Sequence, residues 1–218
     1  MKTWENNYKN LKRYNNYPHD FIVSETLKHF KNGNKIKALD LGCGGGGNTK
    51  FLAEQGFLTY GVDASQTAVN LTKKKLVKSK KKKIIKANFE NLPFKKNFFN
   101  LIIDRASLTH NTESSLKEKI IPEVGRVLKK NGIIISLFWS SNHSDKIYGK
   151  RIKNEKNSFC NFKKGSFKYS PIVFFSSNKD LKQLFINYEF LNMTKIQEKP
   201  TIGKKTNNEY FLIVVKKK

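Results

Sequence analysis

The strongest chemical signal in the sequence is a glycine-rich segment that links an apolar run to a helical pattern. It reads DLGCGGGG and begins at Asp40. Glycines such as Gly42, Gly44 and Gly46 allow a tight turn and let the backbone approach a ligand closely. Asp63 ends the next apolar run, about twenty residues further on, where a carboxylate could bind ribose hydroxyls. The segment and the acid together predict a nucleotide-binding site.

Two other kinds of nucleotide loop fit this segment less well. No Gly-Lys-Ser/Thr follows the glycines, which disfavours a Walker-type phosphate loop. A dinucleotide loop would set Asp40 beside a diphosphate, an electrostatically poor arrangement. An acidic residue before the first glycine suits a cationic ligand better.

His110 is the candidate general base. It follows Asp104 by six residues and should lie near the carboxyl edge of a sheet, where open α/β folds bind ligands. An imidazole there could take a proton from a hydroxyl or amine acceptor. A solvent-exposed or merely hydrogen-bonding histidine stays open as the alternative. His19, His29 and His143 are weaker candidates.

The N-terminal segment carries a regular series of amphipathic side chains: Trp4, Tyr8, Tyr14, Tyr17 and Pro18. These residues could close over a cofactor or acceptor, and Tyr17 is the one expected to reach it. Packing as a helix that caps the core is the equal alternative.

Strand-length apolar runs recur along the chain and alternate with helical patterns. The runs are 36–41, 58–62, 84–85, 101–103, 133–139 and 210–215, and the helical patterns are 21–30, 49–55, 65–75, 116–128 and 178–185. Continuous apolar character suits strands that are buried on both faces. The alternation therefore predicts an α/β fold with a doubly wound, mostly parallel sheet and helices on both faces.

Details of these patterns predict local features. Ser65 is the expected N-cap of the helix over 65–75, and Pro122 should kink its helix or start a second segment. Only about ten residues separate Lys86 from Phe98, too few for a crossover helix, so a loop or single turn is expected there.

The length suits one domain of ordinary size with a hydrophobic core. We expect an N-terminal lid and first helix over 1–35 and the main domain over 36–218, with an insertion near 140–177 over the active-site edge. Aromatic side chains among lysines in the insertion could hold an anionic metabolite or single-stranded nucleic acid. A satellite core under a long loop is the slightly favoured alternative.

With these motifs in place, residues 36–139 resemble the class I S-adenosylmethionine-dependent methyltransferases. Asp40 to Gly46 matches the D-x-G-x-G-x-G loop of that family, and Asp63 with Ala64 matches its ribose-binding acid. Asn88 and Phe89 resemble the stretch that borders the adenine, although an acidic residue is common where Asn88 stands.

The resemblance continues beyond these positions. Asp104 resembles the end of the fourth strand beneath the methionine moiety, and residues 126–132 resemble the turn before strand five, from which Lys130 and Asn131 depart. The resemblance implies a seven-stranded, Rossmann-like methyltransferase fold. It also implies S-adenosylmethionine as cofactor and S-adenosylhomocysteine as product, with Tyr17 among the cofactor contacts.

Three functions follow as alternatives. The first is methyl transfer to an oxygen, or less readily a nitrogen, of a small polar metabolite such as a sugar or carboxylic acid derivative. The second is an RNA methyltransferase that uses the basic surface, and the third is a cofactor-binding protein without catalysis. A looser likeness of the N-terminal segment and of Asp104 to Leu108 points to methyltransferases encoded with bacterial surface-glycan pathways.

The formal charge of +26 invites the nucleic-acid alternative. Only 4 of the 43 basic residues are arginine, and Asn, Ile and Phe are also abundant. The codons of Lys, Asn, Ile and Phe are built wholly or mainly from A and T, so a mutational bias toward those bases would raise all four residue types together. Genome composition is therefore an alternative to nucleic-acid binding as the source of the charge. The lysines between Lys73 and Lys83 should lie at the amino edge of the sheet, opposite the cofactor.

The remaining features concern compartment and metals. No apolar run approaches the ~20 residues of a membrane span, and residues 1–10 lack the apolar segment of a secretion signal. Two cysteines, Cys43 and Cys160, are too few for a disulfide framework, and no motif requires a metal. We therefore expect a cytoplasmic protein with a small-molecule acceptor, with nucleic acid less favoured and an oligomeric state that the sequence leaves open.

Overall fold

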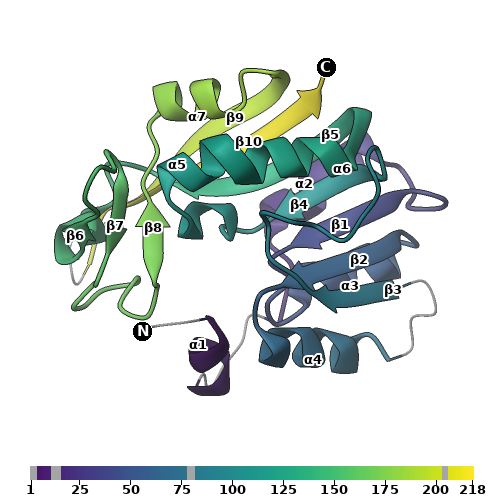
Figure 1. Cartoon of the computed structure of the whole chain (residues 1–218), viewed down its shortest axis with the longest axis horizontal. Helices are drawn as coiled ribbons and strands as arrows, with labels where there is room; N and C mark the ends of the chain where they lie inside the picture. The colour runs from purple at the N-terminus through teal and green to yellow at the C-terminus, as the bar shows by residue number, and fades with distance from the viewer. Residues whose placement is uncertain (1–3, 11–15, 78–81, 203–205) are drawn as a thin grey trace.

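The computed structural model describes residues 4–10, 16–77, 82–202 and 206–218 and centres on one seven-stranded sheet (Figure 1). The strand order is β3-β2-β1-β4-β5-β10-β9. The strands are β1 (Lys37–Leu41), β2 (Leu58–Asp63), β3 (Lys82–Lys86), β4 (Phe99–Asp104), β5 (Leu128–Trp139), β9 (Tyr188–Glu198) and β10 (Asn208–Lys217). The first five are mutually parallel, whereas β10 runs antiparallel to both β5 and β9. The predicted sheet is confirmed.

Helices cover both faces of the sheet, as predicted. They are α1 (Trp4–Asn10), α2 (Asp20–His29), α3 (Gly47–Glu54), α4 (Gln66–Lys75), α5 (Glu113–Ser115), α6 (Ile121–Val127) and α7 (Asn178–Leu184). Ile102 of β4 belongs to the apolar cluster of α6 and α7, whereas its neighbours Leu101 and Ile103 belong to the cluster of α2 and α3. Alternate residues of one strand therefore pack on opposite layers, which explains why its apolar run is continuous.

Two local predictions are confirmed. The Ser65 hydroxyl accepts a hydrogen bond from the backbone N–H of Ala68 at 3.1 Å and caps α4. Pro122 lies in the first turn of α6, directly after a π-helical turn, η2 (Leu116–Ile120). Because proline has no N–H and its ring crowds the preceding turn, the helix restarts there instead of continuing as one α-helix.

The short connection between β3 and β4 contains no helix, as predicted, and Arg126 of α6 holds it. The Arg126 guanidinium donates to the carbonyl oxygens of Leu92 and Phe94 at 3.0 and 2.8 Å. The lysine run also lies as predicted where it is described, because Lys82 pairs with Thr59 near the amino end of β2. Residues 78–81 of that run lie outside the described residues.

The segment between β5 and α7 differs from the irregular insertion that the sequence suggested. It contains a second sheet of three short antiparallel strands, β6 (Lys150–Arg151), β7 (Ser158–Cys160) and β8 (Ile172–Phe174). Its aromatic side chains form a satellite core around Phe162, Phe167 and Phe175. The favoured packing alternative for these aromatic residues is therefore confirmed.

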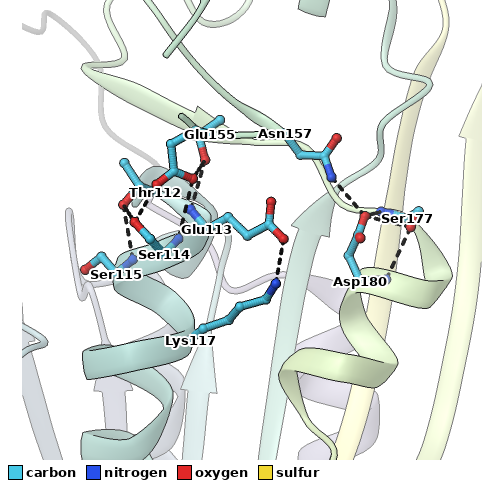
Figure 2. A network of polar contacts seen from close by, with 10 residues as sticks. Thr112, Glu113, Ser114, Ser115, Lys117, Glu155, Asn157, Ser177 and Asp180 are labelled. Carbon is cyan, nitrogen blue, oxygen red and sulfur yellow. Dashed lines mark hydrogen bonds and ion pairs between the residues drawn. The ribbon is translucent and has the colours of Figure 1, made fainter. Parts of the chain in front are cut away.

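Polar contacts attach this small sheet to the segment that follows β4 (Figure 2). Glu155 accepts from the Ser114 hydroxyl, and the backbone N–H of Glu113 donates to the Ser158 hydroxyl at 2.9 Å. On the other side, Asn157 donates to Asp180 of α7 at 3.2 Å. The small sheet is thus held between α5 and α7 at the carboxyl edge of the main sheet.

Candidate cofactor and acceptor site

The glycine loop and Asp63 form one hydrogen-bonded unit at the carboxyl ends of β1 and β2. The two oxygens of the Asp63 carboxylate accept from the backbone N–H groups of Gly44 and Ser65, each at 2.9 Å. Gly42 has a φ of +78°, and a Cβ at that position would collide with Ser107. Glycine is therefore required where the loop turns beneath the segment that follows β4.

A cavity of about 520 Å³ opens above this unit, in the usual size range of ligand pockets. Six of the residues singled out in the sequence line it: Gly42, Asp63, Ala64, Asn88, Phe89 and His110. They come from the ends of β1, β2 and β3 and from η1 (Leu108–His110), which follows β4. The structure thus brings together residues that the sequence separates.

The other residues predicted to bind the cofactor lie outside the cavity wall. Asp40 and Asp104 are buried beneath it, where Asp40 accepts from the Thr49 hydroxyl and Asp104 from the Ser136 hydroxyl, each at 2.5 Å. Asp104 also accepts from the backbone N–H of Ser107 at 2.8 Å, so it shapes the turn after β4.

The remaining three predicted residues are Gly44, Gly46 and Tyr17. Gly44 supports the Asp63 carboxylate, and Gly46 is the N-cap of α3. Tyr17 is 79% exposed, and its backbone packs against Gly47. Trp4 and Tyr8 therefore take the place on the wall that was expected for Tyr17, whereas Tyr14 lies outside the described residues.

Helix α1 covers the cavity and is tied to α4 by Glu5. The Glu5 carboxylate accepts from the hydroxyls of Ser65 and Thr67, each at 2.8 Å, and these bonds lower its pKa to about 2. Asn7 reaches the other side and donates to the carbonyl of Tyr169 at 2.6 Å. In Figure 1, α1 accordingly lies between α4 and the small sheet. Glu5 was missed from the sequence because its partners are 60 residues away.

His110 is held in one orientation by the small sheet and by α1. Its Nδ1 lies 3.0 Å from the carbonyl oxygen of Ile172, and its ring meets Trp4 edge-on with 4.8 Å between ring centroids. Burial lowers the pKa of His110 to about 4. A neutral imidazole that donates from Nδ1 to a carbonyl keeps the lone pair on Nε2, the atom that a general base uses.

Three carboxyl groups have raised pKa values, Asp63 on the cavity wall and Asp40 and Asp104 beneath it. Burial raises the pKa of Asp40 to about 7 and that of Asp104 to about 6, and Asp104 and Asp63 add to the shift of Asp40. Burial also raises the pKa of Asp63. One oxygen of Asp40, Oδ1, is buried without a hydrogen-bond partner. Acids in this state favour a cation above them, because it offsets the cost of ionising them.

Comparison with known proteins finds a family model that resembles part of the chain. Residues 39–136 match the family model described as a methyltransferase domain. Over this stretch, which is just under half of the chain, the sequence is similar to methyltransferase domains. S-adenosylmethionine as the methyl donor agrees with the glycine loop, Asp63 and the buried acids beneath them.

Relatives and solved structures resemble this chain in sequence and in fold. A ubiquinone biosynthesis O-methyltransferase of Pelagibacter ubique is 31% identical over 53% of this chain and 45% of its own length. A tRNA (carboxymethyluridine(34)-5-O)-methyltransferase of Arabidopsis thaliana is 28% identical over 56% of this chain and 28% of its own. A methyltransferase structure from Methanosarcina mazei shares the fold, with a TM-score of 0.72, 20% identity and coverage of 92% of this chain and 98% of that one.

The sequence matches have limited extent. The aligned part spans less than half the length of each curated relative that this chain matches. Within the described ranges, no helix of the chain is long and apolar enough to cross a membrane.

Proposed function

We propose that the protein transfers the methyl group of S-adenosylmethionine to an oxygen of a small polar metabolite, such as a sugar or a carboxylic acid derivative. The observation that carries the proposal is the position of His110 on the wall of the same cavity as Asp63 and Gly42. A base beside a cofactor site is what an oxygen acceptor needs. The names of both relatives given above also refer to transfer to oxygen.

The residues around the cavity fit the cofactor. Asp63 uses two of its roughly four acceptor positions on backbone N–H groups and keeps the others for ribose hydroxyls. We assign Asn88 and Phe89 to the adenine, Gly42 and Ala64 to close backbone approach, and Asp40, Gly44, Gly46 and Asp104 to the support of that wall. When bound, the cofactor supplies an electrophilic methyl group.

Positioning accounts for most of the catalysis in this proposal. Displacement at a sulfonium needs little covalent help, so holding the acceptor in line with the methyl group supplies much of the rate. His110 Nε2 then removes the proton of the acceptor hydroxyl. Helix α1 is the lid, and Trp4 excludes water from the imidazole that it contacts.

RNA is the second candidate acceptor, because one relative is named for tRNA and the chain carries a charge of +26. If the lysines do not serve this purpose, an RNA oligonucleotide binds weakly, without sequence preference, and loses affinity steeply with added salt. A salt-resistant, sequence-selective complex would favour RNA. The relatives give no support to the narrower link with surface-glycan pathways, and the proposal does not include it.

The experiment is a methyl-transfer assay with cofactor labelled on its methyl carbon. Fractionated small metabolites and total RNA are the two acceptor pools, and the Asp63→Ala variant is the control for cofactor dependence. We expect label to enter the metabolite pool. Label in RNA alone would replace the first candidate by the second, and label in neither pool while the protein binds S-adenosylhomocysteine would contradict catalysis on both.

A further inference from the structure

A second cavity of about 410 Å³ adjoins the cofactor cavity. The two cavities have Arg105 and Ala106 in common, the residues that directly follow β4. Other walls of the second cavity come from the end of β5 at Trp139, the start of β10 at Tyr210 and the small-sheet segment at His143. It therefore lies over β4, β5 and β10, on the opposite side of Arg105 from Asp63.

Arg105 is the cation at this shared wall. Among residues 4–10, 16–77, 82–202 and 206–218, no hydrogen bond or ion pair forms with its guanidinium, although Asp40, Asp20 and Tyr8 are near enough to act on its charge. Partial burial lowers its pKa, whereas Asp40, Asp20 and Tyr8 act in the opposite direction. Five N–H donors in a planar fork that the protein leaves unused match a carboxylate.

Two further side chains that line the second cavity, Trp139 and His143, carry N–H groups. The indole Nε1 of Trp139 is buried without a hydrogen-bond partner. His143 accepts from the backbone N–H of Asp145 at Nδ1, at 3.1 Å, and burial lowers its pKa, so the neutral ring carries its proton on Nε2. A buried N–H without an acceptor, such as that of Trp139, is costly. Together with Arg105, the N–H group of His143 gives this cavity an excess of donors, which points to a ligand that is rich in acceptors.

The wall of the second cavity around Tyr210 determines the shape and the charge of the ligand that would fit there. Tyr210 donates its hydroxyl to Glu198 at 3.0 Å, so the one carboxylate that lines this cavity in the described part of the chain already has a donor. The rings of Tyr210 and Trp139 lie 5.9 Å apart between centroids and are nearly perpendicular. Aromatic walls of this kind favour a flat, partly apolar ligand.

We propose that this second cavity holds the methyl acceptor and that the acceptor is a small planar carboxylate, bound through Arg105 beside the ring of Trp139 and the Nε2 donor of His143. The inference rests on the proposed function, since it assigns the acceptor side of the same site. Arg105 acts by binding the carboxylate in the second cavity, and the acceptor hydroxyl reaches past Arg105 and Ala106 into the cofactor cavity, where His110 is the base.

The test uses a matched pair of probes, 4-hydroxybenzoate and the neutral 4-hydroxybenzamide, with S-adenosylhomocysteine present at saturation. The protein has two tryptophans, so its indole N–H groups give two NMR signals, and the Trp4→Phe variant identifies that of Trp139. We expect 4-hydroxybenzoate to move the Trp139 signal in a saturable manner and to bind about tenfold or more tightly than the amide.

Two arginine variants complete the design. Arg105→Gln should reduce the affinity for the acid to that for the amide and leave the amide unchanged, and Arg105→Lys should be intermediate because it keeps the charge but not the fork. Arg151→Gln is the matched control, since Arg151 is exposed on β6. In Arg105→Gln, the affinity for S-adenosylhomocysteine should fall far less than the affinity for 4-hydroxybenzoate.

Three results would overturn the inference. They are equal affinity for acid and amide, an unmoved Trp139 signal, and a loss of S-adenosylhomocysteine affinity in Arg105→Gln as large as that for the acid, which would assign the guanidinium to the cofactor. Each leaves cofactor binding by the parent protein intact. Failure of the parent protein to bind S-adenosylhomocysteine would instead contradict the proposed function.

Discussion

The two cavities at the carboxyl edge of the sheet are built in different ways. The cofactor cavity rests on a contiguous glycine loop and on Asp63, which the loop itself holds through the N–H of Gly44. The second cavity is walled by side chains from His19 to Tyr210, contributed by several elements. A local sequence pattern therefore specifies the floor of the first cavity, whereas its other walls and the whole of the second cavity depend on the complete fold.

The two cavities would bind their ligands through different groups, the backbone and buried acids in the first and variable side chains in the second. In the proposed site, backbone turns and buried acids would hold a cofactor of fixed structure, so few substitutions should be compatible with that wall. Side chains on β5, β10 and the small sheet can change without altering the sheet, which lets an acceptor site vary on a constant frame. Substitutions on the two sides should accordingly have separable effects.

His110 is where the largest effect on rate is expected. Replacement by Ala or Gln should lower the rate of methyl transfer by about 10²–10⁴-fold and leave cofactor affinity nearly unchanged. Because the pKa of His110 is lowered to about 4, the rate should be flat near neutral pH and fall only in acid. A variant with the parental rate, or an ionisation near neutral pH that disappears with His110, would contradict this account.

Gly42 and Gly56 offer a matched pair for the glycine wall. Both have positive φ, +78° at Gly42 and +83° at Gly56. A Cβ at Gly42 would collide with Ser107, whereas a Cβ at Gly56 would point into open space. Gly56→Ala should cost about 1 kcal/mol and Gly42→Ala about 2–5 kcal/mol of the free energy of unfolding, since the second adds overpacking to backbone strain. Urea denaturation measures both, and equal costs would show that the loop is not crowded from above.

The acids below the cofactor predict a pH effect. The pKa of Asp40 is raised to about 7, so the folded protein binds an extra proton between pH 3.8 and 7. Without cofactor, stability from this group is therefore present below the unfolded pKa and is lost as pH rises to about 7. A bound cation favours the ionised form, so cofactor affinity should rise about tenfold between about pH 6 and 8.

The Asp40→Asn variant tests this linkage. It should flatten the fall in stability between pH 3.8 and 7, measured by thermal unfolding, and the rise in cofactor affinity between about pH 6 and 8, measured by calorimetry. Glu54→Gln is the matched control, because Glu54 is an exposed carboxylate on α3 and should leave both profiles unchanged. A pH dependence that persists in Asp40→Asn would assign it to another group.

Features that depend on neighbouring residues could be predicted from the sequence, whereas features that depend on distant partners could not. Continuous apolar runs gave the central strands, and the Ser65 cap and Pro122 were read correctly because each acts on its own turn. The small sheet was missed since its strands have two or three residues and show no periodicity. Gly42 and Asp63 follow from a local motif, whereas the roles of Glu5 and Arg105 depend on partners distant in sequence.

Cofactor binding at Asp63 is the central claim, and calorimetric titration with S-adenosylhomocysteine tests it most directly. The parent protein should bind in a saturable manner. Asp63→Ala should weaken binding by about 1.5–3 kcal/mol, because it removes charge-assisted hydrogen bonds to the ribose. Unchanged affinity in Asp63→Ala would contradict the role of that residue, and an absence of binding by the parent protein would contradict the account as a whole.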